Sequence, residues 1–452
     1  MTQSHKTQYV KRKLTRKSLW KRPWFYLLLV LAVVLLAIGL YQIPAIQDKA
    51  YFYVASARAD IAYFFNPPAK QAFSPSGNNT LEPEVVSSLT AMAPTVTATL
   101  VPTQTPTPLP TKQDTPTPTL TLTPTLTPTP VPGAVKLTGI QLELQRFNNC
   151  GPTNLAMALS YWGWEGDQFV TEDVLKPRRE DRNVMPYEML DYVQTETNLL
   201  GVLRYGGDLD MVKKFVAAGF PVLIERGYKA PKEGWMGHYG IIYAYDDEKG
   251  EVRIPDSYLG DISLKYENIQ MYWNQFDGIY LVIYPPEREQ EVLDILGPQA
   301  DRDYNLQYAL DQVTERIKLE EGRELFFAWY SQGSILVEMN DYYGAAKAFD
   351  QAWVVYDELP YDQRPWRITW YQTGPYFAYY YTGRYQDVLD LANQTLYITP
   401  EDALPETWVW RGRANVMLGN RETAIADFRR ALEWHPGWWV ALDELQALGI
   451  YE

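Results

Sequence analysis

The chain contains very few of the residues that cross-link a fold or hold a metal ion. Its 452 residues include a single cysteine, Cys150, and only three histidines. One cysteine excludes an intrachain disulfide, so packed cores must stabilise the fold. Three scattered histidines and one cysteine provide no ligand cluster with zinc spacing, and the sequence has no glycine-rich phosphate loop. We therefore expect neither a metal nor a cofactor.

The chain also has no excess of positive charge. Its net charge of −14 argues against a general nucleic-acid binder, although lysine and arginine crowd the first 22 residues. The length predicts roughly two to four folded units. We interpret the basic cluster as a determinant of membrane topology.

An uncharged, almost wholly apolar stretch at residues 25–41 follows the basic cluster. As a helix it would extend roughly 26 Å, and Trp24 and Tyr41 lie where interfacial aromatic residues extend a span. The pattern predicts a basic cytoplasmic tail (1–23) and a transmembrane helix (24–43), which leaves the rest of the chain outside the cytoplasm. A cleaved signal peptide is the alternative, because Ala55-Ser56-Ala57 resembles a cleavage site, but this site lies well beyond the apolar run.

Two segments without a core of their own follow. Residues 44–91 form a juxtamembrane segment with helical character at 49–65, which ends at Pro67-Pro68. Residues 92–133 are almost entirely threonine and proline, a composition that favours polyproline II and predicts a linker of roughly 120 Å when extended. Such a linker would act as a stalk that lifts a domain away from a membrane.

Folded character returns over residues 134–290, where the predicted helices precede the predicted strands. The patterns predict helices at 154–162, 186–195 and 208–218, and strands at 220–225, 240–245 and 278–284. This order favours an α+β domain.

Residues 291–452 have a helical pattern that repeats. The spacing of these residues resembles the tetratricopeptide repeat, in which paired antiparallel helices pack small residues against large ones. A degenerate copy lies between two clearer ones, so three repeats would share a core. The recurring residues are Trp329, Gly333, Leu336, Ala345, Phe349 and Ala352 in the first copy, and Trp408, Gly412, Asn415, Ala424, Phe428 and Ala431 in the last.

Cys150 precedes an apolar stripe of helical spacing formed by Leu155, Leu159 and Trp162. A helix N-terminus provides partial positive charge and free N–H groups, which lower the pKa of a thiol. A cysteine in this place is typical of a nucleophile, since the thiolate is the attacking species. A buried structural cysteine is the alternative, because free cysteine behaves as a small hydrophobe.

A nucleophilic thiol needs a base, and His238 is the candidate that remains. His5 lies in the cytoplasmic tail and His435 in the last repeat, whereas His238 begins a strand-like run. Asp256 ends the strand that returns after a hairpin, so we expect it to orient the imidazole. Gln145, five residues ahead of the thiol, could donate to an oxyanion together with the Cys150 N–H.

These residues and their neighbours resemble the papain-fold cysteine peptidases of the bacteriocin-leader-processing type over about a third of the chain. The resemblance is carried by Gln145, the run Asn149-Cys150-Gly151-Pro152-Thr153, Gly237-His238-Tyr239 and Ile254-Pro255-Asp256. It implies a nucleophilic Cys150, a general base His238, an orienting Asp256 and an oxyanion donor Gln145. Ser257 departs from the proline that many relatives have after the aspartate. The best-known relatives cut after Gly-Gly on the cytoplasmic side, which this chain's predicted topology does not match.

We therefore expect a membrane-anchored, extracytoplasmic cysteine peptidase that acts on a peptide or protein substrate. Its helical repeats would recruit the substrate or a protein partner. Two alternatives stay open: an enzyme of the same fold that cuts cell-wall peptides, and a non-catalytic surface scaffold that binds peptides.

Overall fold

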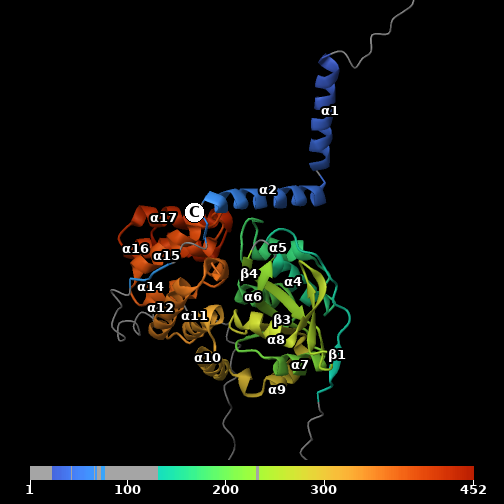
Figure 1. The fold of residues 1–452 in the computed structure, drawn as a ribbon, viewed down its shortest axis with the longest axis vertical. Helices are drawn as coiled ribbons and strands as arrows, with labels where there is room; N and C mark the ends of the chain where they lie inside the picture. The colour runs from blue at the N-terminus through green and yellow to red at the C-terminus, as the bar shows by residue number, and fades with distance from the viewer. Residues whose placement is uncertain are drawn as a thin grey trace, which may run out of the picture. The chain divides into compact units, whose positions relative to one another are not determined.

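The structure is a computed structural model that describes residues 23–41, 43–65, 67–68, 73–76, 131–230 and 234–451. These belong to two compact units, residues 1–61 and 62–452. The predicted basic tail and nearly all of the Thr/Pro tract lie outside the described residues. The second unit contains an α+β region (131–284) and a helical region (286–447), drawn in Figure 1 in green to yellow and in orange to red.

The N-terminal unit consists of helix α1 (Pro23–Tyr41) and most of helix α2 (Pro44–Phe65). The apolar side chains of α1 face outward, as Leu27 (71% exposed) and Leu36 (63% exposed) illustrate. Among the described residues, no helix combines the length and the apolar character needed to cross a membrane, so the predicted span is not confirmed.

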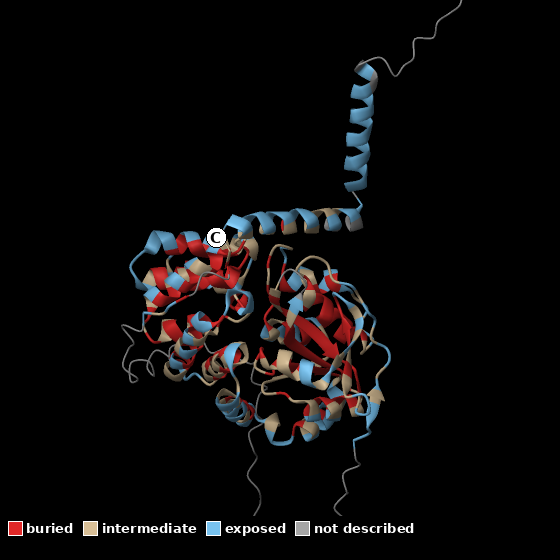
Figure 2. Ribbon diagram, in the orientation of Figure 1, coloured by how far each residue is buried: buried red, intermediate tan, exposed pale blue. Residues whose placement is uncertain are grey.

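A central antiparallel sheet organises the α+β region. Its strands follow the order β2 (Leu200–Arg204), β8 (Tyr280–Tyr284), β3 (Val222–Ala230) and β4 (Gly234–Ile242). Alternate side chains of β3 enter different cores: Leu223 packs toward the N-terminal helices, whereas Val222 and Ile224 pack toward the opposite face. Both faces of this sheet are therefore buried, as the red strands in Figure 2 show.

Helices cover the sheet on both sides. Those on the Leu223 side are α4 (Cys150–Ser160), α5 (Gln168–Leu175) and α6 (Pro186–Glu196). The other core receives α7 (Leu209–Ala217) and α8 (Tyr266–Asn274). A second antiparallel sheet follows the order β1 (Ala134–Lys136), β5 (Ala244–Asp246), β6 (Glu251–Asp256) and β7 (Gly260–Lys265). The α+β class and the hairpin before Asp256 are as predicted.

Strand β4 differs from the sequence prediction. The run was expected to begin at His238, but β4 begins at Gly234 and His238 lies in its middle, opposite Arg226 on β3. The extension arises because Trp235 pairs with Lys229 and is itself only 5% exposed. The hairpin therefore continues past the histidine.

The helical region consists of consecutive packed helices, as predicted, and begins with a short connection. The connection contains η3 (Pro286–Arg288), α9 (Glu289–Leu296) and η4 (Gly297–Ala300). The helices that follow are α10 (Arg302–Leu319), α11 (Gly322–Glu338), α12 (Tyr342–Glu358), α13 (Ile368–Tyr371), α14 (Gly374–Tyr381), α15 (Tyr385–Tyr397), α16 (Pro405–Met417), α17 (Arg421–Trp434) and α18 (Trp439–Ala447), with η5 (Tyr361–Gln363) between α12 and α13.

Glycines let two of the helix pairs approach closely. A Cβ atom on Gly333 of α11 would lie 2.6 Å from the ring of Phe349 on α12. A Cβ atom on Gly412 of α16 would lie 2.4 Å from the ring of Phe428 on α17. The small and large residues that recur in the sequence therefore meet in space, while the assignment to the tetratricopeptide family stays a prediction.

Candidate active site

Cys150 is the first residue of α4, and its side chain is partly exposed. The chain reaches it through Asn148, whose φ of 54° is in the left-handed region. Buried Lys176 fixes this turn by donating from Nζ to the carbonyl oxygen of Asn148 at 2.9 Å. The thiol therefore lies at a helix N-terminus, after a turn that the Lys176 hydrogen bond fixes.

Gln168 organises the loop before Cys150. Its Oε1 accepts from the backbone N–H of Arg146 at 2.8 Å and from Nδ2 of Asn149 at 3.0 Å. Its Nε2 donates to Oε1 of Glu143 at 2.7 Å and to the carbonyl oxygen of Leu144 at 3.0 Å. Gln168 was not predicted, because no local pattern links it to a loop some twenty residues earlier.

His238 and Asp256 meet as the sequence predicted. Nε2 of His238 lies 3.1 Å from Oδ2 of Asp256, and the two side chains are 5% and 0% exposed. The distance suits an ion pair, whereas the ring nitrogen is not aligned for a hydrogen bond. The ring of Tyr228, 5.6 Å from the imidazole centroid, packs beside this pair.

A buried arginine, Arg226, is the charged partner of Asp256 and was not predicted. Its Nη2 lies 2.6 Å from Oδ2 of Asp256, and it is 2% exposed. The N–H groups of Tyr258 and Leu259 donate to Oδ1 at 2.8 Å and 2.9 Å. Burial would raise the pKa of Asp256, but His238, Arg226 and the Leu259 N–H lower it far more. The sequence offers little signal for it, because Glu225 and Lys229 are charged residues of the same strand.

The thiol and the imidazole shift each other's pKa. Burial alone would raise the pKa of Cys150, but the hydrogen bond and charge of His238, the Tyr239 N–H and Lys176 produce a net lowering. Burial alone would lower the pKa of His238, but its contacts with Asp256 and Cys150 produce a net rise. These shifts favour a thiolate paired with an imidazolium.

Gln145 is tied to the residue after Asp256. Its N–H donates to the carbonyl oxygen of Ser257 at 2.7 Å, and the Ser257 hydroxyl donates back to Gln145 Oε1 at 2.7 Å. Nδ2 of Asn154 donates to the same hydroxyl at 2.9 Å and to the carbonyl oxygen of Cys150 at 2.8 Å. Ser257, which stands where many relatives have proline, therefore joins Gln145 to the cysteine helix.

The helical region contacts the strand that carries His238. Trp235 lies with its ring centroid 5.2 Å from Phe327 of α11 and 6.0 Å from Tyr371 of α13. Arg367 donates from Nη1 to the carbonyl oxygen of Trp235 at 3.1 Å. A Cβ atom on Gly237 would lie 2.9 Å from the Tyr371 ring, so only glycine fits beside His238 here. None of these contacts was predicted.

No group of three or more histidine, cysteine, aspartate or glutamate side chains in the described part of the chain could hold a metal ion. The polar groups around Cys150 bond to one another and to the backbone.

Comparison with known proteins agrees with this geometry. The model of the "Peptidase_C39 like family" matches residues 130–284, about a third of the chain. No curated protein matches the chain.

Several solved structures are similar over the same third of the chain. One, from Bacillus anthracis, is described as a C39-like peptidase (18% identity, 33% of this chain, 96% of that chain, TM-score 0.28). Another is a double glycine motif protease from an AMS/PCAT transporter in complex with the leader peptide (20% identity, 33% of this chain, 91% of that chain, TM-score 0.24). A third is xylellain, a cysteine protease from Xylella fastidiosa (16% identity, 34% of this chain, 87% of that chain, TM-score 0.26). The family match supports a cysteine peptidase of the papain-like fold in the α+β region.

Proposed function

We propose that the α+β region hydrolyses peptide bonds with Cys150 as nucleophile, His238 as general base and acid, and Asp256 as the group that orients His238. One observation above all supports this assignment. Cys150 begins α4, His238 lowers the pKa of its thiol, and Nε2 of His238 lies 3.1 Å from Oδ2 of Asp256. Nucleophile, base and orienting group in contact form the arrangement that covalent catalysis requires.

The first half of the reaction is acyl transfer to the thiolate. Sγ of Cys150 forms a bond to the peptide carbonyl carbon, and the carbonyl oxygen becomes an oxyanion. The N–H of Cys150 and the side-chain amide of Gln145 donate to that oxygen, since Gln145 Oε1 is already engaged by Ser257. His238 then protonates the leaving amine, the C–N bond breaks, and a thioester remains on Cys150.

The second half is hydrolysis of the thioester. His238, now neutral, takes a proton from water, and the resulting hydroxide attacks the thioester carbon. The C–S bond breaks and releases a carboxylic acid. The thiolate and the imidazolium, which keeps the proton from water, are thereby restored, and Asp256 stabilises the imidazolium throughout.

The same proposal includes a location and a role for the remaining parts. The N-terminal segment attaches the protein to a membrane with both folded regions outside the cytoplasm, as the basic tail and the exposed apolar side chains of α1 favour. The helical region acts as a tetratricopeptide-like array that recruits the substrate or a protein partner. Since Cys150 is the only cysteine, labelling of intact cells with a membrane-impermeant maleimide reports on its side of the membrane.

Two other functions compete with this one. The same site could cut an amide in cell-wall peptide, and digestion of purified wall peptides beside unstructured proteins distinguishes the two substrates. A peptide-binding scaffold without catalysis is disfavoured, because a binding module has no need for a thiol, an imidazole and a carboxylate in contact.

The decisive experiment is alkylation of Cys150 by iodoacetamide across pH, in the wild type and in His238→Ala. We expect the wild-type thiol to react faster than a free thiol below pH 7, and His238→Ala to remove this advantage. Peptide cleavage should disappear in Cys150→Ala. A thiol that reacts no faster than a free thiol, or that is indifferent to His238, would contradict the proposed mechanism.

A further inference from the structure

A short segment that precedes the Thr/Pro tract is docked on the helical region. Phe73 is only 5% exposed and belongs to the main core of that region. Its ring centroid lies 5.5 Å from Trp353 of α12, in an edge-to-face arrangement, and 6.1 Å from Tyr379 of α14. An isolated aromatic side chain of a non-helical segment is thus buried between helices that lie about 280 residues later in the chain.

The main chain of the same segment is also bound. The N–H of Ser76 donates to Oδ1 of Asp387 at 2.8 Å. Asp387 is 2% exposed, and its Oδ2 accepts from Nε of Arg384 at 2.7 Å. A buried carboxylate oxygen without a hydrogen-bond donor destabilises a fold. The Ser76 N–H supplies such a donor to Asp387.

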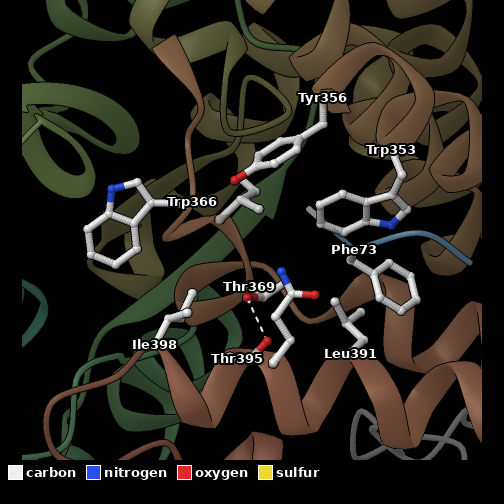
Figure 3. A pocket seen from close by; sticks show the side chains of 10 residues that line it. Phe73, Trp353, Tyr356, Trp366, Thr369, Leu391, Thr395 and Ile398 are labelled. Atoms are coloured by element: carbon white, nitrogen blue, oxygen red, sulfur yellow. Dashed lines mark hydrogen bonds between the residues drawn. The ribbon is translucent and has the colours of Figure 1, made fainter. Parts of the chain in front are cut away.

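Phe73 also forms one wall of a pocket in the helical region, shown in Figure 3. The pocket has about 310 Å³ of space, part of it open to solvent. The hydroxyls of Thr369 and Thr395, which also line it, share a hydrogen bond of 2.9 Å. Its other described lining residues are Trp353, Tyr356, Trp366, Ile368, Leu391, Gln394 and Ile398.

Burial of Phe73 is selective. Phe64 and Phe65, which end α2, are each 80% exposed. All three phenylalanines precede the Thr/Pro tract, so composition does not distinguish them. What distinguishes Phe73 is that its ring packs against Trp353 of α12 and Tyr379 of α14, and that a carboxylate on α15 accepts from the N–H three residues later.

We propose that residues 73–76 are an intramolecular ligand of the helical region, anchored by Phe73 and by the Ser76 N–H. The tract that follows then joins two points of one folded unit, Ser76 beside α15 and Ala134 at the start of β1. A tract attached in this way does not act as a stalk between the N-terminal segment and the enzyme. Phe73 follows the end of α2 by only eight residues, so little chain separates α2 from the docked segment.

Cleavage of the tract tests this arrangement in the full chain. A recognition site for a sequence-specific protease is placed near residue 110, and the purified protein is cut in mild detergent. We expect the two fragments to stay together through size-exclusion chromatography at micromolar concentration. Separation of the wild-type fragments would overturn the proposal, because a docked segment holds them whereas a stalk does not.

Two variants and a matched control identify the contacts. Phe73→Ala should raise the fragment dissociation constant on the order of 100-fold, as expected for loss of a buried aromatic ring. Ser76→Pro, which removes the N–H donated to Asp387, should raise it about 10-fold. Phe64→Ala should leave it unchanged. Equal dissociation constants for Phe73→Ala and Phe64→Ala would show that Phe73 is not the anchor.

A peptide supplied in trans provides an independent measurement. A fluorescent peptide of residues 67–80 should bind the full-length Phe73→Ala protein, whose own segment no longer fills the cavity, and should bind the wild type at least 10-fold more weakly. The Cys150 alkylation rate, measured in each variant, reports that the fold is intact. A peptide that binds both proteins equally well would contradict intramolecular docking.

Discussion

The α+β region and the helical region both bury arginine–aspartate pairs, but the further partner of the aspartate differs between them. Arg226 pairs with Asp256, whose second partner is the imidazole of His238. Arg384 binds Asp350 and Asp387, and Asp387 ends on a backbone N–H. The first arrangement ends on a group that titrates near neutral pH, so its charge can act on a neighbouring thiol. The second arrangement contains no group that titrates near neutral pH, so it can only stabilise the fold.

The cores of the two regions also differ, and a few residues of the α+β region belong to the core of the helical region. Aliphatic side chains such as Leu155, Leu223 and Ile241 fill the core between α4 and the sheet. Aromatic side chains dominate the helical region, and Trp235 of β4 joins that aromatic core three residues before His238. Strand β4 therefore packs in both regions, and the helical region helps to hold the strand that carries His238.

Replacing one arginine in each region is the strongest test of the first difference. Arg226→Met and Arg384→Met should each destabilise the protein by about 3–5 kcal/mol, because each leaves a buried carboxylate without its cation. Only Arg226→Met should shift the titration of His238, and the shift should be to higher pH. Asp256 would then attract the imidazolium without a competing cation. Histidine Cε1–H resonances measure the titration, and three histidines make them easy to assign. An identical His238 titration in both variants would remove the distinction between the regions.

Trp235→Ala tests whether the helical region supports the active site. We expect a loss of about 3 kcal/mol in the free energy of unfolding, since a buried ring is removed from an aromatic core. The enhanced alkylation of Cys150 below pH 7 should also weaken, because the hairpin that holds His238 loses its anchor. Trp439, which is 62% exposed, offers the control substitution Trp439→Ala. If stability falls while the pH profile of alkylation is unchanged, Trp235 matters to packing alone.

Gly412→Ala tests the close packing within the helical region. The new methyl group would lie 2.4 Å from the Phe428 ring, so the helices must separate or the ring must move, at a cost of about 1–3 kcal/mol. The double variant with Phe428→Leu should recover part of the loss, because the smaller side chain leaves room for the methyl group. Chemical unfolding measures all three, and no recovery in the double variant would mean that the strain lies elsewhere. Cys150 alkylation should stay unchanged throughout.

The parts of the site that the sequence predicted are those that depend on local pattern or on elimination. Cys150 is followed by an apolar helical stripe, and it does begin α4. His238 was the histidine that remained after two others were set aside. Asp256 followed from a hairpin, in which the end of one strand must lie near the start of the other. Each inference needed only neighbouring residues or a short list of alternatives.

The parts that were missed depend on contacts between distant segments. Arg226 meets Asp256 across the two sheets, and Ser257 meets Gln145 more than 100 residues away. Trp235 and Phe73 are single aromatic residues whose partners belong to another region. No periodicity marks such residues, because one buried side chain leaves no pattern in its own segment. Only the packed structure shows which single residues of such segments are buried.

The smallest expected effect concerns carboxyl groups where the two regions meet. Burial raises the pKa of Asp181 to about 7. Burial and repulsion by neighbouring carboxylates raise the pKa of Glu188 to about 8 and also raise that of Glu406 on α16. The folded protein therefore keeps protons that the unfolded chain releases above pH 4 to 5, so stability should fall as pH rises toward 8. Glu406→Gln should raise Tm by a few degrees at pH 8 and leave it unchanged at pH 5, whereas Glu422→Gln, at an exposed position on α17, should have no effect at either pH. A gain for Glu406→Gln that is equal at both pH values would mean that packing, and not ionisation of these carboxyls, limits the stability of this contact.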